Sequence, residues 1–445
     1  MNEIIEKVKN SSSSKVKVAI TDIDGILRGK YIHKDKFLSI LEGGFGFCDV
    51  VFGWDSNDVC YENSTFTGWH SGFPDASASI DLNTYRAVPW DNDVPFFLAD
   101  FSEKNNQVCP RTLLKKVLAD ANNEGLDPIF SQEYEWFNFE DTSKELHDRN
   151  FSNLNPITRG MFGYSLIRAS ERSEFFNDLF DLMEKFNIKL EGLHTETGPG
   201  VYEAAIMYAP ILEAADRSVL FKAAVKEIGH RHKIMPTFMA KWDETLPGTS
   251  GHIHQSLWRD GQNIFFDSND SNKMSETMKH YIAGLLHCLP HVLPLYAPTI
   301  NSYKRLVEGA WAPTTITWGI DNRTVAVRAL PGSNKSTRIE MRVPGADMNP
   351  YLAMSAALAS GLYGIKNKLP LNIKATEGNG YTNKENGVLP KNLEEATQQF
   401  SSSEISKELF GETFVKHFTE TRLWECQQAQ KAVTSWELQR YFEII

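Results

Sequence analysis

Hydrophobic and polar residues alternate in the N-terminal quarter of this chain. Residues 16–32, "VKVAITDIDGILRGKYI", alternate around Asp24-Gly25, which predicts a β-hairpin. Residues 80–101 form a second strand-rich run that ends in "PFFLADF". Between these runs, residues 53–75 are rich in Gly, Asp, Asn and Trp and show little periodicity. This stretch predicts a long loop of the kind that often carries function.

Helical periodicity begins after Cys109-Pro110, where "RTLLKKVLADANNEG" predicts a helix that ends at Gly125. Further helices are expected at 171–186, 211–231, 273–288 and 350–364, the last with Asn349 as its N-cap and Pro350 at its first position. Residues 368–395 are rich in Gly, Asn and Lys and predict an irregular excursion.

The change of pattern predicts a domain boundary near residue 105, with a first domain at 14–105 and a second at 106–445. Most connections between the expected strands are too short for repeated crossover helices. The expected fold class is therefore α+β with antiparallel strand pairing, and a doubly wound parallel sheet is disfavoured.

One apolar segment carries two carboxylates. "IFSQEYEWF" at 129–137 has the composition of a buried strand, yet it contains Glu133 and Glu135, which share one strand face. Adjacent carboxylates repel each other, and uncompensated burial costs several kcal/mol for each. For one such strand, exposure of that face to solvent is the ordinary explanation.

The same pattern recurs in "LHTETGPGVYEAAI" (193–206), "GTSGHIHQSL" (248–257) and "STRIEMRVP" (336–344). The polar residues of these segments are Glu196 and Glu203, then His252, His254 and Ser256, then Arg338, Glu340 and Arg342. A solvent-exposed sheet could produce one such segment. Four segments, each with its charges on one strand face, predict a cavity lined by charged groups.

Glutamates with a histidine and no cysteine favour Mg²⁺ or Mn²⁺. The arginines offer forked donors for carboxylate or phosphate oxygens. "NRTVAVR" adds Arg323 and Arg328, which are five residues apart and can reach one ligand only if a bulge or strand end separates them. The chain has neither a GxxxxGK nor a GxGxxG phosphate loop. Phosphate binding by metals and arginines favours an ATP-using ligase or kinase.

The composition excludes few classes of function, but it bears on which partners the protein binds. The chain of 445 residues is long enough for about two to three domains. Its net charge of −11 and its lack of long Lys or Arg runs give no sign of a nucleic-acid or membrane surface. Its five cysteines include no CxxC pair, and no signal core is evident at the N-terminus, so we expect free thiols and a cytoplasmic protein.

The chain resembles the glutamine synthetase family over nearly its whole length. The motifs that carry this resemblance appear in family order: "DIDGILRGK", "EYEWF", "ETGPGVYE", "SGHIHQS", "NSYKRLVEG", "NRTVAVR" and "TRIEMRVPGADMNPYLA". The resemblance implies an N-terminal β-grasp domain and a C-terminal catalytic domain whose antiparallel sheet lines the active site. It also implies a homo-oligomer, a dodecamer of two hexameric rings, in which the neighbouring subunit's N-terminal domain completes each site.

The resemblance also implies roles for individual residues. By position, Glu135, Glu196 and Glu203 match the ligands of one divalent metal, and Glu133, His252 and Glu340 match those of a second metal on the ATP phosphates. His254, Ser256, Lys335 and Arg338 match nucleotide contacts, and Arg323 and Arg328 match arginines on the transferred phosphate. Arg305, Arg342 and the Gly248 backbone match the glutamate site, Tyr164 matches a residue near the ammonium pocket, and Asp55 matches an aspartate lent by the adjacent subunit.

The implied chemistry uses ATP and two to three Mg²⁺ or Mn²⁺ ions per site. ATP phosphorylates the glutamate γ-carboxylate, and a nitrogen nucleophile attacks the resulting acyl phosphate. This chemistry agrees with the residues, because phosphoryl transfer depends mainly on positioning and on charge stabilisation.

The loop "RLVEGAWAP" at 305–313 departs from the family pattern. In ammonia-using members it reads Arg-Leu-Val-Pro-Gly-Tyr-Glu-Ala-Pro, and Trp311 stands in place of that glutamate. An indole has no basic site but offers an apolar wall and a cation–π surface worth about 0.5–2 kcal/mol. We therefore expect a primary amine as acceptor and a γ-glutamyl amide as product. A base is still required, and the candidates are Asp55 and Glu308.

Three alternatives remain open from the sequence. The first is a glutamine synthetase that uses ammonia, the second a non-catalytic structural member of the family, and the third a kinase on the same architecture. The complete set of six metal-type ligands disfavours the structural alternative, because a non-catalytic protein gains nothing from mutually repelling buried carboxylates.

Overall fold

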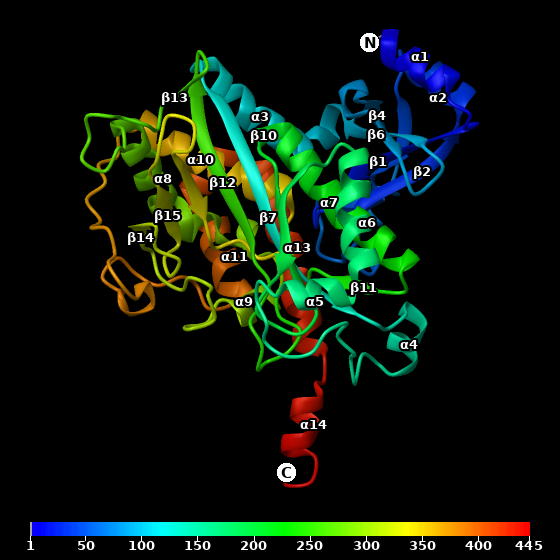
Figure 1. Ribbon diagram of the computed structural model, residues 1–445. Coiled ribbons are helices and arrows are strands. Elements are labelled where there is room, and N and C mark those ends of the chain that lie inside the picture. The colour runs from blue at the N-terminus through cyan, green and yellow to red at the C-terminus, as the bar shows by residue number, and fades with distance from the viewer. Residues whose placement is uncertain (1) are drawn as a thin grey trace.

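The computed structural model describes residues 2–445, which form two β-sheets surrounded by helices (Figure 1). The first sheet has the strand order β2-β1-β6-β4-β3, with β5 paired to β6. Its strands are β1 (Lys15–Thr21), β2 (Leu27–His33), β3 (Phe45–Cys48), β4 (Asp75–Ile80), β5 (Arg86–Val88) and β6 (Val94–Phe101). The expected hairpin is confirmed, because β1 and β2 pair antiparallel around Gly25, whose φ is +80°.

The first sheet has its own hydrophobic core. β1 lies in the middle, antiparallel to β2 and parallel to β6. Two short helices, α1 (Asn2–Asn10) and α2 (Lys34–Ile40), contribute Val8 and Phe37 to this core. The predicted loop at 53–75 runs from a 3₁₀ turn, η1 (Asp49–Phe52), to β4.

The second sheet carries the charged strands. Its order is β14-β15-β16-β12-β7-β9-β8, with β10 and β11 paired to β7 and β13 paired to β12. Its strands are β7 (Asp127–Phe139), β8 (Leu190–Thr195), β9 (Val201–Ile206), β10 (Ala209–Pro210), β11 (Met235–Thr237), β12 (Gly251–Arg259), β13 (Gln262–Asn263), β14 (Trp318–Ile320), β15 (Val327–Leu330) and β16 (Arg338–Met341). All pairs are antiparallel except β14–β15, so the expected α+β fold is confirmed.

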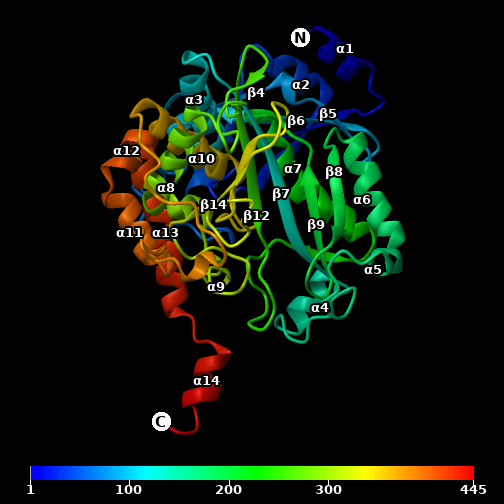
Figure 2. The ribbon, with the colours of Figure 1, turned by 60° about the vertical axis from the view of Figure 1, so that its left-hand side comes forward.

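Helices from both halves of the second domain pack against one another beside this sheet (Figure 2). The principal ones are α3 (Pro110–Asn123), α6 (Ser173–Lys185), α7 (Ile211–Arg231), α8 (Glu276–Tyr296) and α10 (Pro350–Lys366). The remaining helices are α4 (Ser143–Asp148), α5 (Leu166–Glu171), α9 (Ser302–Arg305), α11 (Leu393–Ser402), α12 (Glu404–Phe410), α13 (Glu412–Lys431) and α14 (Ser435–Tyr441). None of the helices within residues 2–445 is long and apolar enough to cross a bilayer.

The start of α10 agrees with the sequence prediction, whereas the end of α8 does not. Asn349 caps α10 by accepting a hydrogen bond from the Tyr351 amide, as predicted. The predicted end of α8 at residue 288 is wrong, because the helix continues through Pro290 and Pro294 to Tyr296. Val292, Leu293 and Leu295 in this extension are fully buried, so tertiary packing outweighs the cost of proline in a helix.

Arg111 of α3 links the first sheet to α7 through buried ion pairs. Its guanidinium donates to Asp100 Oδ2 on β6 at 2.7 Å and to Asp81 Oδ2 at 2.9 Å, just after β4. It also donates to both carboxylate oxygens of Asp216 on α7, at 2.8 Å each. One arginine therefore pairs with three carboxylates between the first sheet and α7.

Lys222 of α7 is a cation without an ion-pair partner among the described residues, and Lys226 lies one turn further along the helix. Its ammonium donates to the carbonyls of Ala346 (2.8 Å) and Met348 (3.1 Å) and lies over the rings of Tyr134 and Phe238. Burial lowers the pKa of Lys222 to about 7. Above this pH the folded protein holds Lys222 neutral, whereas the unfolded chain keeps it protonated.

This difference predicts how the stability depends on pH. Because the folded state binds fewer protons, the stability of the wild type should rise, relative to Lys222→Met, between about pH 7 and about pH 10. Thermal melting of both proteins across this range measures the effect, with the exposed Lys407→Met as the control. A wild-type advantage that stays constant with pH would contradict this account of Lys222.

Candidate active site

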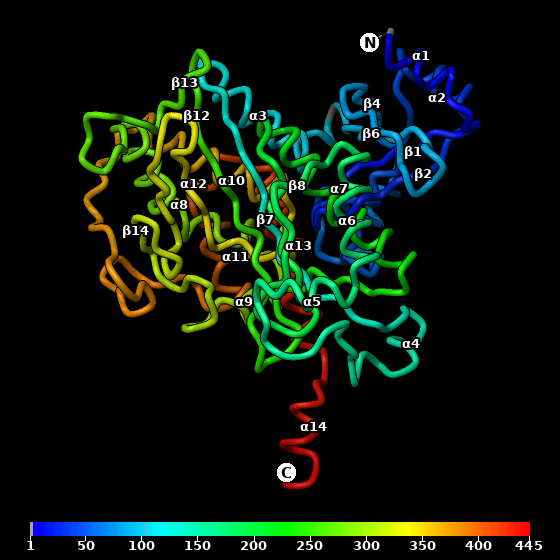
Figure 3. The backbone as a smooth tube through the Cα atoms, viewed as in Figure 1, coloured from blue at the N-terminus to red at the C-terminus, as the bar shows by residue number. Residues whose placement is uncertain are grey.

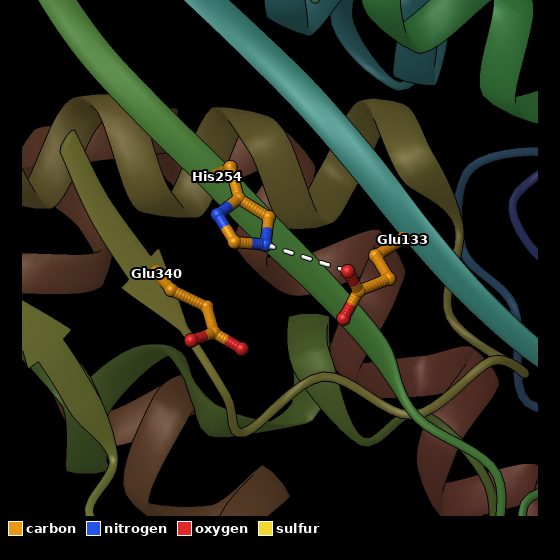
Figure 4. A group of neighbouring side chains, drawn as sticks. All are labelled: Glu133, His254 and Glu340. Atoms are coloured by element: carbon orange, nitrogen blue, oxygen red, sulfur yellow. Dashed lines mark ion pairs between the residues drawn. The ribbon is translucent and has the colours of Figure 1, made fainter. Parts of the chain in front are cut away.

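Strand register places Glu133 of β7 directly opposite His252 of β12. The His252 Nδ1 lies 3.2 Å from Glu133 Oε1 and 3.3 Å from Glu340 Oε1 on β16. His254, two residues further along β12, has its Nε2 at 3.9 Å from Glu133 Oε2. Figure 4 shows Glu133, His254 and Glu340 directed toward one another from three adjacent strands.

Glu340 is almost completely buried, with 1% of its side chain exposed. Arg328 donates to its Oε2 at 2.8 Å, and Arg342 donates to its Oε1. Burial alone would favour the neutral acid, but the surrounding His252, Arg342 and Arg328 hold the pKa of Glu340 well below its usual range. This carboxylate is therefore ionised and ready to accept a cation.

The first carboxylate cluster fits a divalent metal ion. One ligand atom from each of Glu133, His254 and Glu340 lies within 4.8 Å of the others. The Nε2 of His252 is buried and has no hydrogen-bond partner among the described residues. Two carboxylates and imidazole nitrogens suit Mg²⁺ or Mn²⁺. The sequence assigned only His252 to this metal, and the structure places both histidines against the same carboxylates.

A second group of carboxylates lies further along β7. Glu135 is in register with Glu203 of β9, and its Oε2 accepts a hydrogen bond from the Ser250 amide at 2.6 Å. Burial raises the pKa of Glu203, and the nearby carboxylates of Glu133 and Glu135 add to the rise. A dication among these groups would remove this repulsion.

Glu196 lies in the turn after β8, where its carboxylate accepts from the Thr197 amide. Its charge, like that of Glu203, acts on His194 and on Tyr164. The structure therefore brings Glu133, His252 and Glu340 together and places Glu135 opposite Glu203 on the same sheet, whereas Glu196 lies in the adjoining turn.

His194 is a site residue that the sequence reasoning missed. Its Nε2 lies 3.2 Å from Glu203 Oε1, and the ring of Tyr164 stacks on it with centroids 4.4 Å apart. Burial opposes the charged imidazole, but the hydrogen bond with Glu203 outweighs it and raises the pKa of His194. The signal was present, because His194 and Glu196 are two residues apart, as Glu133 and Glu135 are.

The residues assigned to the nucleotide line one cavity of about 1,100 Å³. His254, Ser256, Lys335 and Arg338 all border it, together with Glu133 of the first carboxylate cluster. Arg338 Nε donates to His254 Nδ1 at 3.2 Å. The cavity is large enough for a drug-sized ligand, and it opens directly onto the carboxylate cluster.

Arg305 is buried beside Gly248, whose added Cβ would lie 2.7 Å from the Arg305 Cγ. Arg305 donates to the carbonyls of Val343 (2.9 Å) and Arg342 (3.3 Å). The three residues assigned to glutamate therefore lie together, with Arg342 linking them to Glu340. Arg323 lies in the turn before β15, so a strand end separates it from Arg328, as the spacing required.

Trp311 and Glu308 lie in the loop 306–313, which we call the acceptor loop. Trp311 has φ of +57°, a left-handed conformation that costs an L residue about 1–2 kcal/mol, and it is 59% exposed. Glu308 forms an exposed ion pair with Lys384 at 2.8 Å. Glu308 therefore does not contact the carboxylate clusters in this conformation.

Asp55 does not contact either carboxylate cluster of its own chain. Its Oδ2 accepts from Trp424 Nε1 on α13 at 3.0 Å, and its Oδ1 accepts from the amides of Asn57 and Val59. The side chain is 9% exposed. A role for Asp55 in catalysis therefore requires the site of another subunit.

The comparison with protein families decides the classification. The model for the glutamine synthetase catalytic domain matches residues 107–441. The chain belongs to the glutamine synthetase family. This family member is an ATP-dependent carbon–nitrogen ligase, and the family depends on ATP and divalent metal, which agrees with the carboxylate clusters and the cavity.

Relatives of this glutamine synthetase family member carry different names. It is 52% identical to type-1 glutamine synthetase 2 of Dictyostelium discoideum over 99% of this chain and 86% of the relative. It is 35% identical to a glutamate–isopropylamine ligase of a Pseudomonas species over 97% of this chain and 95% of the relative. A solved structure of GmaS with ADP superposes with a TM-score of 0.86 at 26% identity, covering 99% of this chain and 100% of that chain.

Proposed function

We propose that the protein joins glutamate to a primary amine, using ATP, to form a γ-glutamyl amide through γ-glutamyl phosphate. The observation that carries the choice of an amine is Trp311 in the acceptor loop, which is exposed and held in a left-handed backbone conformation. Strained residues cluster at ligand sites, and an indole favours an alkyl chain and its cationic head over a bare ammonium ion. The name of the Pseudomonas relative supports the same acceptor class.

In this proposal one metal is held by Glu135, Glu196 and Glu203, and a second by Glu133, His252 and Glu340. The bound dications would supply positive charge to the ATP phosphates. The nucleotide would lie in the cavity, where His254, Ser256, Lys335 and Arg338 bind it.

Two pairs of arginines have separate roles in this proposal. Arg328 and Arg323 stabilise charge on the transferred γ-phosphoryl group, and the buried ion pair with Glu340 fixes the Arg328 guanidinium in advance. Arg305, Arg342 and the Gly248 backbone hold the amino acid donor with its γ-carboxylate toward the phosphate. Most of the catalysis is then positioning within a charged cavity.

The acceptor amine must lose a proton before it attacks. Asp55 of a neighbouring subunit or Glu308 would serve as the base, and Tyr164 would form a second aromatic wall. Tyr164 has φ of +56° and is 70% exposed, so it shares with Trp311 a left-handed backbone and an accessible ring. A ring assembly of two hexamers in the cytoplasm fits this scheme, because it would bring Asp55 to an adjacent site.

The C-terminal arm supports self-association. α14 extends away from the rest of the molecule in both ribbon views (Figures 1 and 2). The apolar side chains of α14 and of the residues that follow it are exposed, including Trp436 at 58%, Phe442 at 84% and Ile444 at 85%. Clustered apolar residues on a projecting helix favour burial against another chain, and a second copy of this chain is the partner we propose.

An ammonia-using glutamine synthetase is the second candidate, and the name of the Dictyostelium relative favours it. ADP release with Mg²⁺, ATP and glutamate separates the two candidates when ammonium is compared with a panel of mono-, di- and polyamines. We expect higher kcat/KM for an amine than for ammonium. Higher kcat/KM for ammonium would contradict the proposal, and no ADP release with any acceptor would favour a structural role.

Substitutions of Trp311 test whether this residue determines the preference for an amine over ammonium. Trp311→Glu should shift the ratio of kcat/KM for amine over ammonium toward ammonium by about tenfold or more, because it replaces an apolar wall with a carboxylate. Trp311→Phe keeps an aromatic ring and should retain the amine preference. If both variants keep the wild-type ratio, Trp311 does not face the acceptor.

A further inference from the structure

A short segment of the irregular excursion at 368–395 lies against the acceptor loop. This segment is the 3₁₀ turn η4 (Gly380–Thr382), in the orange part of the trace in Figure 3. The Gly380 amide donates to Thr324 Oγ1 at 2.7 Å, and the Gly380 carbonyl accepts from Thr315 Oγ1 at 2.9 Å. Thr315 follows the acceptor loop, and Thr324 follows Arg323.

Backbone hydrogen bonds also join residues 387–389 of the excursion to residues 314–316. The Leu389 amide donates to the Thr314 carbonyl at 2.9 Å, and the Ile316 amide donates to the Gly387 carbonyl at 3.1 Å. A Cβ at Gly380 would lie 2.7 Å from the Thr324 carbonyl oxygen, so the backbones approach as closely as glycine permits. η4 is therefore fixed between residues 314–316, which directly follow the acceptor loop, and the turn that carries Arg323.

Tyr381 of η4 has a buried hydroxyl that lacks an acceptor. The residue is 8% exposed, and its hydroxyl oxygen lies close to the Trp311 amide, but the O–H donates to none of the described residues. Hydrogen bonds connect η4 to the donor site, because Arg342 Nε donates to the Arg323 carbonyl at 3.1 Å, next to Thr324, which holds Gly380. In agreement, burial raises the pKa of Tyr381, and the guanidinium groups of Arg342 and Arg305 oppose the rise. Buried hydroxyl groups in folded proteins are nearly always hydrogen-bonded, so the O–H of Tyr381, unlike that of Tyr296 in the helical core, is available to a ligand at the donor site.

We propose that the Tyr381 hydroxyl donates a hydrogen bond to a carboxylate oxygen of the bound amino-acid donor, which makes Tyr381 a further substrate-binding residue. This inference rests on the proposed function, because it takes Arg305 and Arg342 as the donor site. A carboxylate is the chemistry that satisfies all three groups, since two guanidinium groups and a phenolic O–H are all donors. The hydrogen bonds of η4 with Thr315 and Thr324 place Tyr381 next to the residues that follow the acceptor loop and next to the turn that carries Arg323.

Tyr381→Phe tests the inference because it removes the hydroxyl and keeps the ring. With Mg²⁺, ATP and the preferred acceptor, KM for glutamate should rise about tenfold, as expected for one hydrogen bond to a charged group, while KM for ATP stays unchanged. Titration of glutamate into the protein with Mg²⁺ and a non-hydrolysable ATP analogue should show the same loss of affinity. The melting temperature should not fall.

The matched control is Tyr296→Phe. Tyr296 on α8 is also buried with an unpartnered hydroxyl, but it lies in the helical core. Its removal should leave KM for glutamate unchanged. An unchanged glutamate KM in Tyr381→Phe, or a fall in melting temperature without a change in glutamate affinity, would overturn the inference alone. A wild-type protein that releases no ADP with glutamate would instead overturn the proposed function, and the inference with it.

Discussion

Glu340→Gln should lower the rate of ADP release about 100- to 1,000-fold, the cost of removing one preorganised electrostatic group from an active site. Glu340 is the point where the metal site and the arginines meet, because its two oxygens contact His252, Arg328 and Arg342. The amide keeps the shape of the side chain but carries no charge. It can neither bind a dication tightly nor neutralise the two guanidinium groups.

The control for this variant is Glu404→Gln. Glu404 makes the same kind of contact, an ion pair with Lys407 at 2.7 Å, but its side chain is 86% exposed. Its loss should not change the rate. Because Glu340 is buried, the variant must also be shown to fold, and Glu133→Gln at the 23% exposed side chain of β7 gives a second test of the same cluster. Activity of both variants within a few-fold of wild type would contradict the assigned site.

Arg111→Met should destabilise the folded protein by about 3–5 kcal/mol, the usual cost of removing one partner from a buried ion-pair network. The substitution leaves Asp81, Asp100 and Asp216 without their shared cation between the first sheet and α7. Lys115 compensates only in part, because it reaches Asp100 at 2.6 Å and Asp81 at 3.4 Å but makes no ion pair with Asp216 among the described residues.

Thermal melting at neutral pH measures this loss. The control is Lys407→Met, which removes an exposed ion pair between neighbouring helical turns and should change stability by less than about 1 kcal/mol. If Arg111→Met melts at the same temperature as the control, the network does not hold the first sheet against α7.

The sequence predicted the faces of the strands because side chains alternate with a fixed period of two. Glu133 and Glu135 on β7, and His252 and His254 on β12, could be assigned to one face without a structure. What the sequence could not supply was the register between strands. The pairing of Glu133 with His252, and of Glu135 with Glu203, depends on turns and long connections, and it is the pairing that makes clusters from separate segments.

Residues outside regular elements were the hardest to predict. The excursion at 368–395 has no periodicity, so nothing in its sequence indicated that Tyr381 would be buried near Arg305 and Arg342. The end of α8 was misplaced for a different reason, because proline is a strong local signal for a helix end and the packing of Leu293 and Leu295 overrides it. In both places tertiary contacts decide the structure.

We propose that carboxylates from distant segments of the chain gather here to hold two dications on the ATP phosphates. The most direct measurement is a crystal structure with Mn²⁺ and a non-hydrolysable ATP analogue, in which anomalous scattering locates the manganese. We expect one peak bounded by Glu135, Glu196 and Glu203, and another bounded by Glu133, His252 and Glu340, with the analogue in the cavity beside them. Manganese found elsewhere, or an analogue bound with both clusters empty, would contradict the account.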